Sequence, residues 1–520
     1  MYRDSVFHHW IPKPIQNILL FVLTLPTMVV PSIFTSNTAD VYSGLGTLAE
    51  TLSYANNANT VGLMLGLGIV FKFVRYIRPK ITIVATFIGM AICSLGIGMA
   101  EDPMIIIGGS FLMGFVKIFA MLLLVTPLTL LLSPTGDRGR FYALLYPIIL
   151  GLGQLIGYAA AELTYLMDWH AIYLVAAALL FSCALLSILF LHNHWTAKPL
   201  VIPKIDWIGA MLFTVANLLL NYLLVYTKEE GWFDASPKLN IALGIFIIVT
   251  ALFIRRQLFT DNPFIPLAVF RKRNVLTAMV LFSLMGMYMA TNSMQSNFTA
   301  ILHYDSRTTA LLNLWMIPGV IIGGLIAFHW FKYERSLRSL LFIAFGCFML
   351  NTMSLYFLIA PIVDFSYFFI PTLLRGTGIA LVYVGGGFYF ANLLTPAQLI
   401  GAYPMVIGVR SFIGTAFFGA LFSWALYRLQ WDNIADLATH LDAMDTIIGQ
   451  RGNGVQLYPA IQQQSNLMAI KQLLGYTALG SVIVMIYISL HPFYRLKHRK
   501  VILFRKRFLR ESTAGYLDEG

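Results

Sequence analysis

A few ionisable side chains lie inside long apolar stretches of the chain, and these residues are the best placed to do chemistry. They are Lys117, Glu162, Arg375 and Arg410. A Lys or Arg at the centre of a bilayer costs at least about 2.5–3.5 kcal/mol on insertion scales. Each of the four therefore has either a functional role or a fixed structural partner, and each is a candidate site residue.

Lys117 and Glu162 suggest two different roles. Lys117 follows Ser110 by seven residues, which places both on nearly the same face of a helix. We expect Lys117 to be a fixed positive charge, with a structural contact to a helix dipole or carbonyl as the alternative. A carboxylate such as Glu162 can exchange a proton for a cation, because desolvation favours its neutral form and a cation its charged form. The candidates for proton coupling are Glu162, Lys117, Asp40 and Glu50; for Glu162 the alternative is a wetted interfacial position.

Other polar residues in the apolar stretches are candidates for lining a binding cavity. Arg375 and Arg410 either bind an anionic group or lock helices together by donating to carbonyls. Uncharged polar side chains either face a cavity or form interhelical hydrogen bonds, worth about 0.6 kcal/mol on average in membrane proteins. The candidate lining residues are Asn56, Asn57, Asn59, Gln154, Tyr158, Asn292, Gln295, Arg375 and Arg410, with Tyr146, Tyr288 and Tyr383 added as aromatic surfaces for an apolar ligand.

The elements that hold these side chains must be membrane-spanning helices. The chain has 520 residues, of which 58% are hydrophobic and 11% charged, and its mean hydropathy is +0.75. This composition excludes an ordinary water-soluble domain. A span needs about 20 apolar residues, because it crosses roughly 30 Å at 1.5 Å per residue. We therefore expect an all-helical polytopic membrane protein with fourteen spans, near residues 15–35, 52–73, 81–100, 104–132, 141–163, 170–191, 207–226, 239–258, 275–298, 309–331, 338–360, 366–393, 400–427 and 471–491.

The charges between the spans predict the topology. Lys and Arg gather in alternate joints, after the second, fourth, sixth, eighth and tenth spans, while the other joints are neutral or acidic. The positive-inside rule explains the net charge of +12 better than a nucleic-acid partner does. Both termini are therefore expected in the cytoplasm. The basic tail 494–520 is expected to lie on anionic lipid headgroups or to serve only as a topology anchor.

Two polar segments divide the chain. The joint from His192 to Asp206 is long enough to link two bundles, and the outward segment 431–468 is large enough to fold or to dock a partner, with a solvated loop as its alternative. The predicted domains are a six-helix bundle at 1–191, a linker with inserted helices 7 and 8 at 192–274, a second six-helix bundle at 275–493 that includes the outer loop 431–468, and the cytoplasmic basic tail at 494–520.

Several strings along the chain are recognisable by their order and spacing. They are Pro134–Arg140, Asp168–Tyr173, Asp206–Gly209, Asn262–Leu267 and Arg410–Gly414. Together with the span count, they resemble the 14-helix drug/proton antiporter branch of the major facilitator superfamily, the EmrB-type exporters. The resemblance implies two bundles built from inverted three-helix repeats, with a substrate cavity between them near the midplane.

The sequence also departs from that family pattern. The Asp of the family's first span corresponds to Leu25, and the Asp of its motif after span 2 corresponds to Val70. The Arg of span 4 corresponds to Ser110, and the Gly-Pro of span 5 reads Gly157-Tyr158. These departures predict a divergent subgroup, in which Lys117 replaces the missing Arg of the N-terminal half.

From these features we expect a secondary active transporter that exports lipophilic or drug-like small molecules by proton-driven alternating access. The sequence contains no Walker A string, so ATP is not the direct energy source, and it contains no HExxH, paired CxxC or GxSxG motif. We therefore expect no enzyme activity, no cofactor and no metal. The resemblance implies a bacterial inner-membrane protein whose partners are substrate, protons and lipid, and which passes its substrate to a periplasmic adaptor and an outer-membrane channel. From its size and its outward side alone, segment 431–468 is a candidate docking surface for these partners.

Two other functions remain open. A transporter of a specific organic anion, siderophore or lipid-like metabolite is favoured by the excess of Lys and Arg over carboxylates inside the spans. A non-transporting membrane scaffold or sensor on a degenerate transporter fold is favoured by the loss of the family's carboxylates, although the retained polar residues oppose it. Transport of a dye cation and of an organic anion into proteoliposomes under a proton gradient would separate the three.

Overall fold

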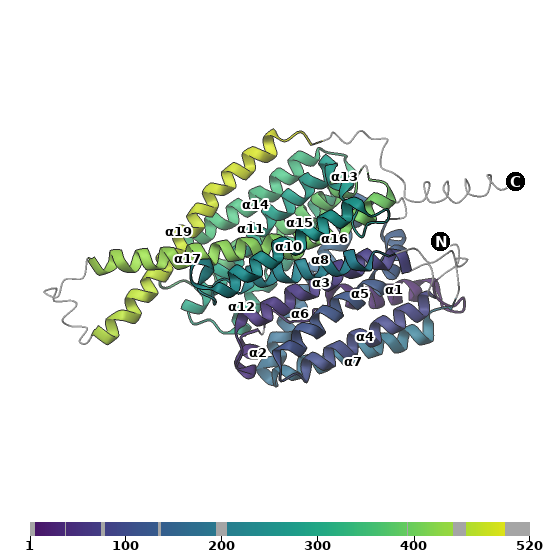
Figure 1. Ribbon diagram of the computed structural model, residues 1–520, viewed down its shortest axis with the longest axis horizontal. Helices are drawn as coiled ribbons and strands as arrows, with labels where there is room; N and C mark the ends of the chain where they lie inside the picture. Colours follow the sequence, from purple (N-terminus) through teal and green to yellow (C-terminus); the bar gives the residue numbers. More distant parts are fainter. Residues whose placement is uncertain are drawn as a thin grey trace.

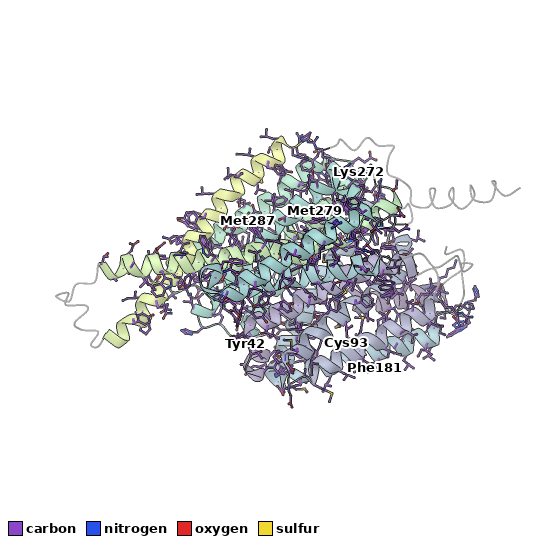
Figure 2. All side chains as sticks on the ribbon, viewed as in Figure 1. Tyr42, Cys93, Phe181, Lys272, Met279 and Met287 are labelled. Atoms are coloured by element: carbon purple, nitrogen blue, oxygen red, sulfur yellow. The ribbon has the colours of Figure 1, made fainter. Side chains whose placement is uncertain are left out.

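The computed structural model is all-helical and describes residues 6–36, 38–73, 78–133, 137–193, 205–392, 394–439 and 454–493. The first bundle contains α1 (Lys13–Val29), α2 (Thr38–Leu45), α3 (Ala49–Phe73), α4 (Pro79–Gly98), α5 (Pro103–Leu132), α6 (Arg138–Leu166) and α7 (Trp169–Phe190). Its core is a continuous apolar cluster that includes Leu23, Phe87 and Leu124. Cys93 of α4, labelled in Figure 2, packs against this cluster.

A second bundle is formed by the described residues between 267 and 493. Its elements are η1 (Leu267–Arg271), α11 (Arg273–Ile301), α12 (Ser306–Leu314), α13 (Met316–Lys332), α14 (Leu337–Leu358), η2 (Phe365–Phe368), α15 (Phe369–Ala391), α16 (Pro396–Gly408), η3 (Val409–Ile413), α17 (Gly414–Thr439) and α19 (Gly454–Leu490). Phe282, Phe345 and Phe348 lie in its apolar core. The two bundles form the two sides of the molecule, coloured purple to blue and teal to yellow in Figure 1.

The inserted helices are α8 (Trp207–Val225) and α10 (Pro237–Phe259), joined through the short α9 (Trp232–Ala235). Helix α8 packs against both α3 and α10. At the start of α8, Asp206 accepts hydrogen bonds from Gly209 N–H and from Arg256 Nε, the latter at 2.6 Å. The side chain of Gln257 reaches from Asp206 to the N–H of Ile265. Gln257 thus links two of the strings noted in the sequence, Asp206–Gly209 and Asn262–Leu267, by hydrogen bonds.

Twelve helices in the described part of the chain are long and apolar enough to cross a membrane. Helix α1 is apolar but has only 17 residues, and α3 is not among the twelve. Helix α3 carries Glu50, Asn56, Asn57 and Asn59, which lower its hydropathy. The expected all-helical membrane fold is confirmed, while the count of fourteen spans stays a prediction.

Helices α17 and α19 project together beyond one end of the molecule (Figure 1), and we call this pair the arm and this end the arm face. Helix α19 has 37 residues and is about 55 Å long, well beyond the roughly 30 Å of a bilayer's hydrocarbon core. In the arm, Gln430 donates to Asn466 Oδ1 at 2.7 Å, and Asn433 donates to Gln472 Oε1 at 3.1 Å.

The arm corrects one expectation. Segment 431–468 is not a loop in its described parts, because α17 continues to Thr439 and α19 begins at Gly454. Two Asn side chains of this segment, Asn433 and Asn466, instead bond across the two helices to Gln472 and Gln430.

Several predictions fall outside the described residues. They concern most of the linker, at 194–204, residues 440–453 of segment 431–468, the basic tail at 494–520, and the start of one family-like string at 134–136.

Candidate functional site

Arg410 lies where the two bundles meet. It belongs to the π-helical segment η3, which joins α16 to α17, and such segments occur frequently at functional sites. Its Nη1 donates to the hydroxyl of Tyr146 on α6 at 3.2 Å, and its guanidinium carbon lies 4.6 Å from the ring centroid of Tyr383 on α15. The Nε of Arg410 is buried and has no hydrogen-bond partner among the described residues. One edge of the guanidinium is therefore available to an acceptor that this part of the chain does not supply.

Tyrosines from both bundles surround this guanidinium. Tyr142 and Tyr146 come from α6, Tyr383 from α15 and Tyr403 from α16; we call these four the tyrosine cluster. The hydroxyls of Tyr142 and Tyr403 are 3.3 Å apart, and the ring of Tyr146 lies 5.4 Å from that of Tyr142 and 5.3 Å from that of Tyr383. Phenols can donate hydrogen bonds while their ring faces stack on apolar groups. The cluster and Arg410 together suit a ligand with one polar end and a flat apolar body.

Arg375 is a second buried cation, and its partners are all neutral. Its Nη1 donates to Gln295 Oε1 at 3.0 Å and also to Asn292 Oδ1, both on α11, and its Nη2 donates to Asn313 Oδ1 on α12 at 2.9 Å. The residue is only 3% exposed. Amide oxygens satisfy the donors of the guanidinium but do not cancel its charge. The structure thus brings together three of the predicted residues, and it adds Asn313, which no pattern in the sequence singles out.

Lys117 is the buried cation of the first bundle, inside α5. Its Nζ donates to Asn59 Oδ1 at 3.0 Å, and Asn59 Nδ2 donates to the carbonyl of Ser110 at 3.1 Å. Gly114 allows α3 and α5 to come this close, since a Cβ there would lie 1.8 Å from the carbonyl oxygen of Asn59. Each bundle therefore holds one buried cation that is bound to amide oxygens.

Glu162 does not lie free inside its span. Both of its oxygens accept hydrogen bonds from Arg307 at the start of α12, from Nε at 2.7 Å and from Nη2 at 2.8 Å. Tyr158 also hydrogen-bonds to Arg307, whose guanidinium stands over the ring of Tyr165 at 5.2 Å. Arg307 was not a sequence candidate because it lies 145 residues from Glu162 and near a span end, where a charge is unremarkable.

Helix α6 is joined to the second bundle at its other end as well. Arg138 Nη1 donates to the carbonyl of Ala391 on α15 at 3.0 Å, and Gly139 lies against the ring of Phe331. Between the two ends, Gly324 of α13 accommodates Pro147 of α6. One helix of the first bundle therefore contacts the second bundle along most of its length.

A pair of carboxyl groups lies at the arm face, beside the inserted helices. Glu50 in the first turn of α3 hydrogen-bonds to Glu229 in the turn after α8. Partial burial, this hydrogen bond and the charge of Glu50 raise the pKa of Glu229 from 4.5 to about 7. Nearby, the hydroxyl of Tyr226 donates to Thr51 Oγ1 at 3.3 Å. Asp40, the other predicted carboxylate here, lies in α2, where its carbonyl accepts from Ser43.

The other uncharged residues predicted to line a cavity lie in different parts of the structure. Asn57 donates to Asn221 Oδ1 at 2.9 Å, so it fastens α3 to the inserted helix α8. Tyr288 stacks on Phe348 inside the core of the second bundle, with ring centroids 4.8 Å apart. Asn56 on α3 and Gln154 on α6 are half-buried. Their roles as cavity-lining residues stay predictions.

Comparison with known proteins agrees with a transporter fold. No family model matches the chain. An uncharacterized MFS-type transporter of Bacillus subtilis (strain 168), YwoD, is 24% identical over 304 residues, which span 56% of this chain and only 63% of the relative.

Among solved structures, a POT family transporter in complex with 5-aminolevulinic acid aligns with a TM-score of 0.57 at 12% identity, over 94% of this chain and 98% of that one. A point mutant of the nucleoside transporter NupG aligns with a TM-score of 0.54 at 12% identity, over 91% and 99% of the two chains. The proton:xylose symporter XylE aligns with a TM-score of 0.50 at 11% identity, over 87% and 92%.

These similar proteins are transporters and not enzymes, as expected for this chain from its sequence. At such low identities the solved structures establish the fold only. The two bundles, the helices inserted between them and the similarity to YwoD lead to one conclusion: the chain is a multi-pass membrane protein with the fold of the major facilitator superfamily.

Proposed function

We propose that this chain is a proton-coupled secondary transporter whose substrate is an organic anion with a lipophilic body. The observation that carries the proposal is the guanidinium of Arg410, which lies between the two bundles with its Nε buried and without a hydrogen-bond partner in the described part of the chain. A carboxylate or phosphate accepts hydrogen bonds from such an edge in the geometry that guanidinium prefers.

The other interior charges support an anionic substrate. Lys117 and Arg375 are buried and bound to amides, and none of the ion pairs between described residues includes Lys117, Arg375 or Arg410. Uncompensated cations in a medium of low dielectric constant attract anions over long distances. A bound anion therefore lowers the cost of keeping these three charges inside the membrane.

Alternating access requires that the bundles separate at one face while they stay joined at the other. Helix α6 makes one polar contact with the second bundle at each face of the molecule, and each contact can hold its face closed. Glu162 and Arg307 join the bundles at the arm face, and Arg138 and the carbonyl of Ala391 join them at the opposite face. Breaking either contact while the other holds would open a path to the Arg410 site from one side.

Proton coupling follows from the chemistry of the first of these contacts. Protonation of Glu162 removes its charge, so the ion pair with Arg307 is lost and the arm face opens. The proton would be picked up from that face and released when the pair forms again. Glu50 and Glu229, which share a proton at the same face, are a second candidate for this role.

A second candidate function is proton-driven efflux of uncharged or cationic lipophilic compounds, as in the EmrB-type exporters that the sequence resembles. The tyrosine cluster favours it, because four aromatic rings at the interface can stack on many flat apolar molecules. In that case Arg410 would hold the tyrosines in place through its contacts with Tyr146 and Tyr383.

The same resemblance supports a bacterial inner-membrane location. The charges between the spans support both termini in the cytoplasm, and therefore an arm that extends into the periplasm. Such an arm is a suitable docking surface for a periplasmic adaptor that leads to an outer-membrane channel. Pull-down of an adaptor by the full chain and not by a chain with a shortened arm tests this; equal recovery by both chains would contradict it.

The proposed function is tested by transport into proteoliposomes under an imposed proton gradient. We expect uptake of an aryl carboxylate that collapses when the gradient is dissipated and falls at least tenfold in Arg410→Gln. A dye cation that the wild type moves under the gradient, with no transport of the carboxylate, would favour the second candidate. No gradient-dependent movement of either probe would favour a scaffold or sensor.

A further inference from the structure

A groove of about 540 Å³ opens between the inserted helices, away from the Arg410 site. Its lining residues follow the spacing i, i+3, i+4, i+7 on both helices, which is that of a single stripe on a helix. Such a stripe is about 10 Å long, or a third of the hydrocarbon core of a bilayer. The lining residues are Val215, Leu218, Leu219 and Tyr222 of α8, Lys238, Ile241, Ala242 and Ile245 of α10, and Tyr54 of α3.

The walls of this groove are aliphatic and open outward. Ile241 is 64% exposed and Ile245 is 45% exposed, although both lie in a helix long and apolar enough to span the membrane. A side chain exposed at that depth contacts lipid, and a groove among such side chains fills with hydrocarbon because water is not available there. The chemistry of the lower part of the groove therefore fits an acyl chain.

The mouth of the groove lies at the arm face and is polar. Lys238 stands in the first turn of α10, and its Nζ makes a long contact of 3.4 Å with Glu230 Oε1, while Glu230 Oε2 accepts from Ser236 at 3.0 Å. On the opposite wall, the rings of Tyr222 and Tyr54 lie 5.2 and 5.8 Å from that of Tyr226. Aromatic rings beside charged groups are typical of the level of lipid headgroups.

Charges of both signs surround this mouth. Glu229 follows Lys228 and precedes Glu230 in the turn after α8, and its carboxyl group meets that of Glu50. Lys238 is largely exposed, so its ammonium group can bind a further anion. The mouth thus offers an ammonium group to a phosphate and carboxyl oxygens to a nearby cation.

We propose that this groove binds one phospholipid from the leaflet at the arm face, with an acyl chain between α8 and α10, its phosphate at Lys238 and a primary-amine headgroup at Glu229 and Glu50. A primary ammonium donates up to three hydrogen bonds to carboxyl oxygens, whereas a quaternary choline donates none. A glycerol headgroup leaves the lipid negatively charged and facing these acidic residues. The expected order of affinity is ethanolamine, then choline, then glycerol.

The test is native mass spectrometry of the purified full chain in detergent, titrated with ethanolamine, choline and glycerol phospholipids that carry identical acyl chains. We expect one ethanolamine lipid to bind about fivefold more tightly than the choline lipid, the ratio that roughly one net hydrogen bond gives. Leu219→Trp fills the groove from α8 and should weaken this binding at least tenfold. Ile248→Trp is the matched control, since Ile248 is 61% exposed on α10 and does not line the groove.

Three further variants test the other wall and the mouth of the groove separately. Ala242→Leu narrows the groove from α10, and it serves as the test of the groove if Leu219→Trp does not fold. Glu229→Gln should retain the acyl chain but remove the preference for ethanolamine over choline, while Lys238→Met should weaken all three lipids. If both groove variants bind the ethanolamine lipid as tightly as Ile248→Trp does, the groove is not the lipid site. If the wild type binds the three lipids with equal affinity, the mouth does not recognise the headgroup.

Discussion

Glu162 of α6 and Arg307 of α12 form a two-point ion pair, at 2.7 and 2.8 Å, that joins the two bundles at the arm face. The pair is half-exposed, with 30% of the Glu162 side chain and 44% of the Arg307 side chain accessible. Exposed pairs of this kind contribute about 1 kcal/mol or less to stability. An interaction of this size can hold the arm face closed and still be broken in every transport cycle.

Glu162→Gln should therefore open the arm face without unfolding the protein. We expect up to about a fivefold increase in the population with separated bundles, since about 1 kcal/mol is lost. The measurement is the electron–electron distance between spin labels at Leu166 and Leu311, in a background without native cysteines. The exchange Glu162→Arg with Arg307→Glu should restore the wild-type distribution. Identical distributions in wild type and Glu162→Gln would contradict a gating role.

The amide partners of Arg375 should matter for stability. Asn313→Leu removes one acceptor from a buried guanidinium, and a buried donor left unsatisfied costs about 1–3 kcal/mol. We expect a clear fall in the melting temperature of the protein in detergent. Asn297→Leu is the matched control, because Asn297 is exposed on α11. Equal melting temperatures for the two variants would show that Arg375 does not depend on Asn313.

Asp206 should be a structural residue. Burial opposes its charge, but hydrogen bonds from Gly209 N–H and Arg256, the charge of Arg256 and a bond from Gln257 hold its pKa below the ordinary 3.8. Its contribution to stability is therefore present above pH 3.8 and is lost as the pH falls through its lowered folded pKa.

Asp206→Ala should cost up to about 3 kcal/mol, because it leaves Arg256 without its buried partner. Asp102→Ala removes a helix cap that has no ion pair, and should cost about 1 kcal/mol. Chemical denaturation at neutral pH compares the two variants. Equal losses would mean that the ion pair adds nothing to the cap.

Glu229 should make stability depend on pH near neutrality. Its pKa is raised from 4.5 to about 7, so in this range the folded protein holds a proton that the unfolded chain releases. Stability should therefore fall as the pH rises from 4.5 through about 7. Glu229→Gln should flatten this part of the curve of melting temperature against pH. A curve that keeps its slope in the variant would contradict the shared proton.

Much of the fold could be predicted from hydropathy alone. The expected span 170–191 is α7 at Trp169–Phe190, and 104–132 is α5 at Pro103–Leu132. The prediction of a loop at 431–468 was wrong in its described parts, because a hydropathy pattern identifies apolar membrane-spanning segments and does not identify polar helices. Once α17 and α19 leave the bilayer, their exposed surfaces are polar, and a polar helix resembles a loop in composition.

The candidate site was predictable in its residue types but not in its pairings. The cost of a buried charge was enough to select Lys117, Arg375 and Arg410. Their partners were harder to find, since Asn313 is neutral and Arg307 lies near a span end where a charge costs little. Which helix supplies the hydrogen-bond partner of each charged residue depends on how the helices and bundles pack. No local pattern in the sequence predicts that packing.

The most direct test of an anionic substrate at Arg410 is a binding measurement with two nearly isosteric probes, an aryl carboxylate and the corresponding neutral aryl amide. Thermal shift in detergent should show stabilisation of the wild type by the carboxylate and not by the amide. Arg410→Gln should abolish this stabilisation, whereas Lys80→Gln should not, because Lys80 in α4 donates to the carbonyl of Ile188 in α7 and is not part of the tyrosine cluster. Equal stabilisation of wild type and Arg410→Gln by the carboxylate, or of the wild type by both probes, would contradict the account.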